Sequence, residues 1–173
     1  MTKPKPLIFA FAGGGTGGHL LPGLAVAESL RQQCPDAKVP VFVTCREIDE
    51  KVLQPTGYAF TRQWVEPFSL NPWGFLSFTY GLISSTHEAA GSLAVLRPAA
   101  VLGMGGFAAG PGGVIAWLLR RPLLIHEQNS VAGMTNRWLL PFARTAMEAF
   151  PGSLPANRHP VHTGNPVRAE ITR

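Results

Sequence analysis

The sequence predicts an α/β fold, a Rossmann-like doubly wound parallel sheet, and three observations support this prediction. Short apolar runs alternate along the 173 residues with stretches whose apolar residues recur at helical spacing. Glycine-rich loops follow two of the apolar runs and precede helical stretches, as in sheets that bind ligands at the carboxyl ends of their strands. Hydrophobic residues make up 46% of the chain and charged residues 14%, enough to bury a core in one domain.

The individual elements follow from local patterns. Apolar runs bounded by glycine or proline predict buried strands, while apolar spacing of three and four residues predicts helices. Strands are predicted at 7–12, 39–45, 58–64, 99–102, 122–126, 144–149 and 161–163. Helices are predicted after each glycine-rich loop (from residue 20, and up to residue 119) and at 48–53, 72–96 and 135–140. Residues 151–160, with three prolines, are expected to form a surface loop.

Composition excludes several classes of protein. No apolar run approaches the roughly 20 residues of a membrane span, and the N-terminal run at 7–12 is too short for a signal peptide. The two cysteines, Cys34 and Cys45, lack metal or redox spacing and indicate a reducing compartment. The net charge of +5 lies entirely in residues 97–173, where all basic residues are arginines. This surplus suits phosphate or an anionic bilayer surface, or is ordinary solubility charge; no signature of nucleic-acid binding is present.

The first glycine-rich loop, residues 13–19, joins the first strand to the first helix. Its glycines allow close approach to an anion and formally contain a dinucleotide fingerprint, but residues 44–46 lack the acidic partner at the end of the second strand. A tight turn without ligand is the alternative. His19 opens the helix, where the dipole disfavours its charged form, so we expect a neutral imidazole able to accept a proton. Otherwise it hydrogen-bonds its own loop.

Two further segments reach the same edge of the predicted sheet. The second glycine-rich loop, residues 103–113, would form with the first a paired cradle for a diphosphate, unless it is a flexible hinge. Glu127 follows a strand and is a candidate base, hydroxyl acceptor or orienting partner. Asn129 is a candidate reader of a hydroxyl or amide, with helix capping by Asn129 or Ser130 as the alternative. Arg168 follows the last strand.

The motifs together resemble the MurG family of peptidoglycan N-acetylglucosaminyltransferases, which convert lipid I to lipid II. The matching segments occur in the family's order and cover nearly the whole chain: GGTGGH (14–19), PGLAVAESL (22–30), LGMGGFAAGPGG (102–113), HEQN (126–129), AGMTNRWL (132–139) and GNPVR (164–168). The resemblance implies the amino-terminal, acceptor-binding half of a GT-B glycosyltransferase at residues 1–168. Residues 169–173 would then begin the interdomain linker, with the donor-binding domain absent from this chain.

The resemblance also implies a reaction and a set of site residues. A hydroxyl of the undecaprenyl-diphosphate-linked acceptor attacks UDP-GlcNAc with inversion, and the half-enzyme alone is expected to be inactive. His19 is implied as the general base, with Glu127 as the alternative, and neither a cofactor nor a metal is expected. Residues implied to reach the donor are Thr16, Gly17, Gly18, Asn129 and Arg168. Those implied to cradle the acceptor diphosphate are Gly14, Gly15, Gly105 and Gly106.

A membrane patch is implied as well, which would place the protein peripherally on the cytoplasmic face of the bacterial plasma membrane. Its residues are Trp73, Phe75, Leu76, Phe78, Ile83 and Trp117. The helix at 72–96 departs from the family because Glu88 is its only charged residue, and 69–74 lacks the family's glycine–basic loop. The patch residues could instead be core.

Two other functions remain open at this point. One is a non-catalytic subunit that anchors a separate donor-binding chain at the membrane. The other, suggested by the first loop alone, is a dinucleotide-binding module.

Overall fold

A computed structural model describes residues 6–66 and 70–167 of the chain, and Arg168 and residues 169–173 lie outside this part. It contains one parallel sheet of seven strands in the order β3-β2-β1-β4-β5-β6-β7, which confirms the predicted fold class. The strands are β1 (Phe9–Ala12), β2 (Val41–Thr44), β3 (Phe60–Gln63), β4 (Ala100–Gly103), β5 (Leu123–Glu127), β6 (Thr145–Glu148) and β7 (Val161–His162).

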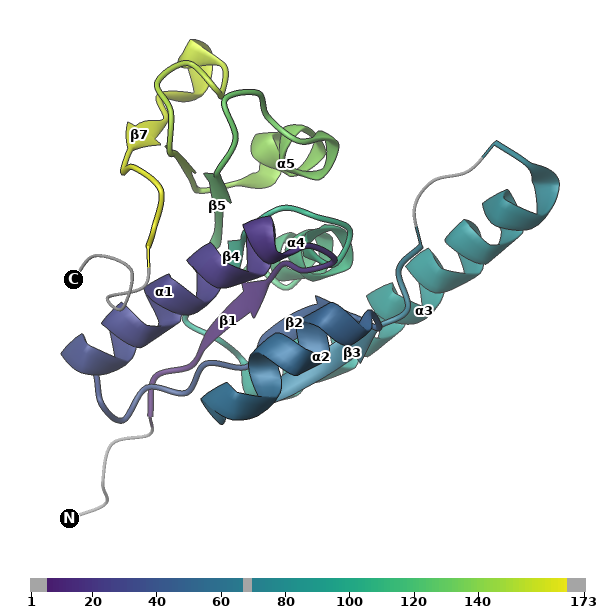
Figure 1. The fold of residues 1–173 in the computed structure, drawn as a ribbon, viewed down its shortest axis with the longest axis horizontal. Helices are drawn as coiled ribbons and strands as arrows, with labels where there is room; N and C mark the ends of the chain where they lie inside the picture. The colour runs from purple at the N-terminus through teal and green to yellow at the C-terminus, as the bar shows by residue number, and fades with distance from the viewer. Residues whose placement is uncertain (1–5, 67–69, 168–173) are drawn as a thin grey trace.

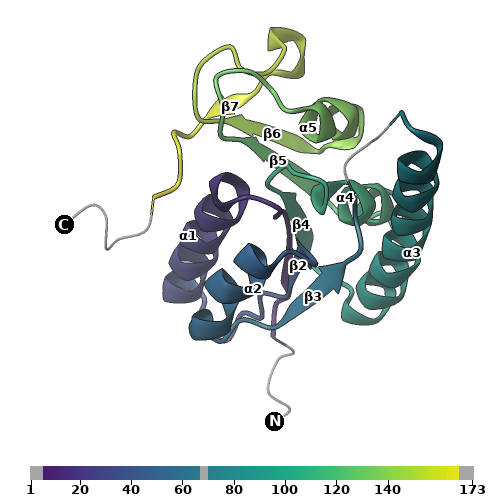
Figure 2. The same ribbon diagram turned by 45° about the vertical axis from the view of Figure 1, so that its right-hand side comes forward.

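Helices cover both faces of this sheet, as Figures 1 and 2 show, with α1 and α2 on one face and α3, α4 and α5 on the other. The helices are α1 (Gly17–Gln33), α2 (Glu47–Leu53), α3 (Pro72–Leu96), α4 (Ala109–Leu118) and α5 (Met134–Leu139). The described part of the chain also contains three short 3₁₀ helices, η1 (Gln54–Thr56), η2 (Leu140–Phe142) and η3 (Ala156–Arg158). The last of these lies within the predicted surface loop. The predicted helix at 72–96 has the bounds of α3.

The core divides between the two faces because neighbouring residues of a strand point to opposite sides. In β1, Ala10 and Ala12 belong to the apolar cluster that includes residues of α3, α4 and α5. Phe11 belongs to the other cluster, with residues of α1 such as Leu20 and Leu24. The alanines leave room for helices to approach the sheet closely on the first face.

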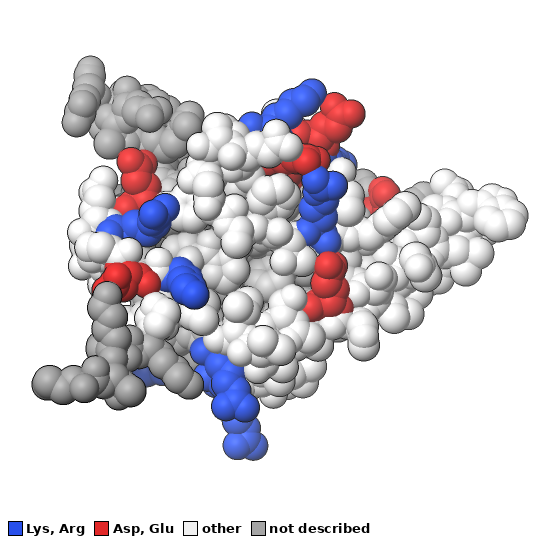
Figure 3. Space-filling view, turned by 90° about the horizontal axis from the view of Figure 1, so that it is seen from below, with Lys and Arg blue, Asp and Glu red and all other residues white. Residues whose placement is uncertain are grey.

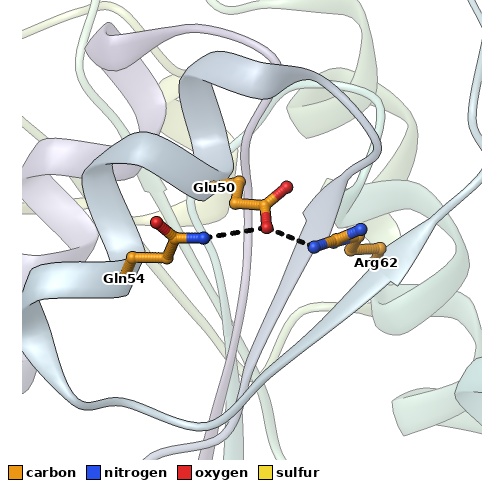
Figure 4. A network of polar contacts seen from close by, with 3 residues as sticks. All are labelled: Glu50, Gln54 and Arg62. Atoms are coloured by element: carbon orange, nitrogen blue, oxygen red, sulfur yellow. Dashed lines mark hydrogen bonds and ion pairs between the residues drawn. The ribbon is translucent and has the colours of Figure 1, made fainter.

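The edge of the sheet at β3 is held to α2 by polar contacts. Figure 4 shows Glu50 of α2 between Gln54, which donates a hydrogen bond of 3.0 Å to it, and Arg62 of β3, which pairs with it. Exposed ion pairs of this kind contribute little to the free energy of unfolding. They fix the position of a short helix whose N-terminal turn carries Asp49, a residue of the site described below.

Two findings bear on how the chain could relate to a membrane. Across the described part of the chain, no helix combines the length and the apolar character that a bilayer crossing requires. Helix α3 is nevertheless the most protruding element of the ribbon in Figure 1, and it extends well beyond the sheet. It begins in a well-defined cap, where the Asn71 side chain accepts a hydrogen bond of 2.6 Å from the Gly74 amide.

Candidate functional site

Two glycine-rich turns lie in direct contact at the carboxyl edge of the sheet. They follow the adjacent strands β1 and β4, and the Met104 amide donates a 2.8 Å hydrogen bond to the Ala12 carbonyl. A Cβ added to Gly13 would lie 2.8 Å from the Met104 Cβ, and one added to Gly106 would lie 2.3 Å from the Gly14 carbonyl oxygen. Only glycine permits this approach. The expectation that the two turns share one edge is therefore confirmed.

The second glycine-rich loop is shorter than the sequence predicts. Helix α4 already begins at Ala109, so Gly110, Gly112 and Gly113 are helical. A Cβ on Gly112 would lie 3.1 Å from the Ala12 side chain, and one on Gly113 would lie 2.7 Å from Leu139 of α5. These two glycines let α4 approach the sheet and α5 closely. Within this second loop, only Gly105 (φ +85°) and Gly106 (φ +73°) have left-handed backbone conformations, and these two residues form the turn itself.

His19 lies between the two turns. It is in the first turn of α1, and its Nδ1 is 2.8 Å from the Thr16 hydroxyl. A Cβ on Gly105 would lie 2.9 Å from the imidazole Cδ2 and 3.1 Å from Nε2, so the ring borders the second turn. Thr16 is the N-cap residue, yet its hydroxyl contacts His19 rather than capping a helix amide. The imidazole is thus oriented from its Nδ1 side.

Burial lowers the pKa of His19 below its ordinary value, and the charges of Glu127 and Asp49 oppose this shift only in part. The neutral imidazole expected from the sequence agrees with this direction. The leading cause is desolvation, however, and not the helix dipole on which the expectation was based. A neutral ring can accept a proton from a bound hydroxyl near pH 7.

Asp49, which was not predicted from the sequence, holds the first glycine-rich turn to the end of β2. Its carboxylate is fully buried and accepts hydrogen bonds from the Gly15 amide at 3.0 and 2.8 Å. It also accepts from the Thr44 amide at 3.0 Å and the Thr44 hydroxyl at 2.6 Å. The Arg46 guanidinium donates to the Gly15 carbonyl at 2.9 Å.

The Asp49 contacts change two expectations. The Gly15 amide is engaged by a carboxylate of the chain itself, which argues against the diphosphate contact expected of it. The dinucleotide fingerprint calls for a carboxylate at the end of β2 that holds a ribose, but here the nearby carboxylate is buried and holds the glycine-rich turn. A signal for Asp49 was present, since it is an acidic residue in the first turn of the helix after β2.

Glu127, at the end of β5, is buried and fully hydrogen-bonded. One carboxylate oxygen accepts from the amide (3.0 Å) and side chain (2.9 Å) of Asn129, and the other from the Gly133 amide (2.9 Å) and the Asn136 side chain (2.8 Å). Burial alone would raise its pKa, but these four hydrogen bonds together hold the pKa below the ordinary value. Glu127 is therefore a carboxylate with little capacity to take a proton, which favours His19 as the base.

The residues around Glu127 are fixed by the same network. One N–H of the Asn129 side chain is used by Glu127, so its oxygen and its second N–H are the groups left for a ligand. His126 holds the segment after β7, because its Nε2 lies 3.1 Å from both the Thr163 hydroxyl and the Gly164 carbonyl. The segment continues beside α1, where a cavity of about 260 Å³ lies between Gly17, Gly18, Leu21, Pro22 and residues 165–167. Arg168 lies outside the described residues.

The residues of the implied membrane patch are mostly exposed on α3 and α4. Trp73 is 82% and Ile83 65% exposed, and Phe75, Leu76 and Trp117 are also exposed. Figure 3 shows the protruding end of α3 without charged side chains on the visible face. Phe78 differs, because it is half-buried against the neighbouring helices. The alternative that these residues form the core therefore fails for the exposed five.

Within 6–66 and 70–167, no group of three or more His, Cys, Asp or Glu side chains is placed to hold a metal ion.

Comparisons with known proteins agree with this geometry. Residues 9–148 match the family model of the glycosyltransferase family 28 N-terminal domain. The UDP-N-acetylglucosamine–N-acetylmuramyl-(pentapeptide) pyrophosphoryl-undecaprenol N-acetylglucosamine transferase of Alkalilimnicola ehrlichii is 49% identical over the whole chain, which covers 47% of that protein. The same enzyme of Nitrosococcus oceani is 44% identical over 91% of the chain and 44% of its own length. The chain thus spans about half the length of these relatives.

Solved structures give the same result at the level of the fold. The crystal structure of Acinetobacter baumannii MurG matches 92% of this chain and 46% of its own, with a TM-score of 0.78 and 34% identity. The UDP-GlcNAc 2-epimerase of Neisseria meningitidis shares the fold alone, at 13% identity and a TM-score of 0.64 over 92% of this chain and 46% of its own. On these sequence and structural matches, the chain belongs to glycosyltransferase family 28 and comprises its N-terminal domain.

Proposed function

We propose that this domain binds the lipid-linked acceptor in an inverting transfer of N-acetylglucosamine to an undecaprenyl-diphosphate-linked N-acetylmuramoyl-pentapeptide, the lipid I to lipid II step of peptidoglycan synthesis. The observation that carries this proposal is the contact between the two glycine-rich turns, with His19 between them. The activity for which the relatives from Alkalilimnicola ehrlichii and Nitrosococcus oceani are named supports the substrate class. The amides of Gly14, Gly105 and Gly106 are the candidate donors to the diphosphate.

In the proposed reaction, a hydroxyl of the acceptor sugar forms a bond to the anomeric carbon of GlcNAc. The bond from that carbon to UDP breaks, UDP leaves with the electron pair, and the hydroxyl proton passes to His19. The neutral state of His19, caused by burial, prepares it for this role. We propose that Thr16, Gly17, Gly18, Asn129 and Arg168 face the donor, whose pocket is completed by the half that this chain does not span.

The exposed apolar residues of α3 support peripheral attachment to the cytoplasmic face of the bacterial plasma membrane. The transfer of exposed aromatic and aliphatic side chains from water into the interface of a bilayer is favourable. The net charge of +5 favours an anionic surface, with each basic residue near that surface contributing about 1 kcal/mol. No charged side chain of α3 other than Glu88 opposes this contact.

Binding of a soluble acceptor analogue tests the proposal. The probe is N-acetylmuramoyl-pentapeptide diphosphate bearing a short prenyl group, titrated into the ¹⁵N-labelled chain. The amide signals of Gly14, Gly105 and Gly106 should shift saturably, while Gly57, which precedes β3 at the opposite edge of the sheet, should not. Absence of saturable shifts at the two turns, or larger shifts at Gly57, would contradict the proposal.

A further inference from the structure

An apolar groove opens between α3, α4 and α5, beside the second glycine-rich turn. Its volume is about 310 Å³, which lies within the range of small-molecule sites. Its wall is formed largely by Phe78, Leu82, Val114, Met134, Trp138 and Phe142. Among the described residues that line it, none is charged, and its hydroxyl groups come from Thr86 and Thr135. A groove of this composition suits a hydrocarbon ligand.

One end of the groove borders the second glycine-rich turn, where the diphosphate is proposed to bind. Phe107 lines the groove and directly follows Gly106 of the turn. Gly110 and Pro111, in the first turn of α4, line it as well. The amides of Gly105 and Gly106, which are proposed to hold the anion, are therefore separated by no more than one residue in the sequence from a residue that lines the groove. A hydrocarbon chain attached to a diphosphate at this turn would begin next to this end of the groove.

The groove differs from the exposed outer side of α3. Trp73, Leu76 and Ile83 are exposed and are absent from the groove lining, so the two apolar surfaces are built from different residues. Helices α3 and α4 pack against each other on the same face of the sheet, as Figure 2 shows, and the groove lies on the side of α3 that faces α4 and α5. The two apolar surfaces can therefore serve separate ligands.

We propose that this groove binds the first isoprenoid units of the polyprenyl-diphosphate acceptor, holding them out of the bilayer while the diphosphate occupies the two glycine-rich turns. The inference rests on the proposed function, because it takes the diphosphate site from it. It adds that the acceptor is recognised by its lipid as well as by its head group. A prenyl diphosphate should then bind more tightly than pyrophosphate alone.

Calorimetric titration of the chain with farnesyl diphosphate and with inorganic pyrophosphate tests the inference. We expect farnesyl diphosphate to bind at least about tenfold more tightly, which corresponds to about 1.4 kcal/mol. V114W, which fills the groove, and V114N, which makes it polar, should each remove this difference. Val114 is 37% exposed, so both variants should fold, and circular dichroism confirms this. V95W and V95N, at an exposed position of α3 outside the groove lining, are the matched controls.

The outcomes separate this inference from the proposed function. Equal affinity for the two probes, or equal losses in the Val114 and Val95 variants, would overturn the groove while the diphosphate site stands. Binding of neither probe would overturn both. Two further results would assign the groove to another occupant and also overturn it. One is that V114N binds phosphatidylglycerol vesicles without polyprenyl lipid more weakly than the parent chain does. The other is that the parent chain is a dimer and V114N is a monomer.

Discussion

At the level of single residues, His19 and Glu127 differ in the properties that the proposed role of general base requires. Both are polar groups near the same edge of the sheet, but among the described residues Glu127 receives four hydrogen bonds, whereas the His19 ring has one polar contact, that of its Nδ1 with Thr16. A saturated carboxylate whose pKa is lowered is a poor proton acceptor, whereas a neutral imidazole is a good one.

Replacement of His19 by alanine should therefore lower kcat by about 10²–10⁴-fold in the enzyme completed by its donor-binding half, with little change in KM for UDP-GlcNAc. Steady-state kinetics measure both constants. Since the base acts in its deprotonated form and burial lowers its pKa, kcat of the parent should hold as the pH falls past 6.5 and decline only below that. T16V, which removes only the hydroxyl beside Nδ1, is the control and should lose less. Unchanged turnover in H19A would refute the assignment.

Asp49 provides a second prediction for a single residue. In D49N, an amide replaces a carboxylate that accepts four hydrogen bonds, and its NH₂ group would face N–H and O–H donors. Each buried donor left unsatisfied costs about 1–3 kcal/mol, so the free energy of unfolding should fall by at least about 2 kcal/mol. Urea denaturation measures this loss. The exposed D36N is the matched control, and a similar stability for both variants would contradict the role of Asp49.

The elements show why glycine recurs in this chain. At Gly106, the backbone is left-handed and a Cβ would collide with the Gly14 carbonyl. At Gly91, within α3, nothing lies within 4 Å of an added Cβ. G106A should therefore lower the free energy of unfolding by more than about 2 kcal/mol, while G91A should raise it by about 0.5–1 kcal/mol. Denaturation of the two variants side by side checks this. Equal effects would mean that the turns do not touch.

Helix α3 carries the prediction about the membrane. Trp73 and Ile83 are largely exposed, so W73S/I83S should reduce binding to phosphatidylglycerol vesicles without changing the melting temperature. Co-sedimentation measures the bound fraction. The control is V95S, near the other end of α3, where valine is 83% exposed. Equal losses in the variant and the control would contradict a localised patch. Phe78 is unsuitable for this test because it lines the groove.

The elements also show what the sequence could predict. The pattern of α3 predicts both of its ends, because Asn71 and Pro72 mark the start and Arg97 and Pro98 the end. The sequence could not predict that α4 begins at Ala109, because the glycines of α4 are used for packing against residues distant in the chain. Asp49 could be noticed as an acidic residue in the first turn of a helix, but its role could not be predicted. Its partner Gly15 lies 34 residues away, and no local pattern reveals that contact.

At the scale of the whole molecule, several of the groups with shifted pKa values lie at the carboxyl edge of the sheet. Burial also lowers the pKa of His126, although the Gly164 carbonyl and the Glu127 charge oppose the shift. His19, His126 and Glu127 therefore all have lowered pKa values in the folded chain. Along the chain they belong to α1 and β5, so folding is needed to bring them to this edge. The stability of the domain is thereby linked to pH.

The signs of these shifts predict two separate acid transitions. Because the folded pKa of His19 and His126 is lowered, the unfolded chain binds more protons than the folded chain as the pH falls below about 6.5. The free energy of unfolding of the domain therefore decreases in that pH range. Glu127 contributes stability above its ordinary value of 4.5, and this contribution is lost as the pH falls through its lowered folded pKa. Urea denaturation at pH 7.5 and 5.5 isolates the histidine window. The free energy of unfolding should be lower at pH 5.5, and H19Q should narrow the difference, whereas H87Q, on an exposed position of α3, controls for the loss of a histidine as such. A pH difference that H19Q leaves unchanged would show that the buried imidazole is not its source.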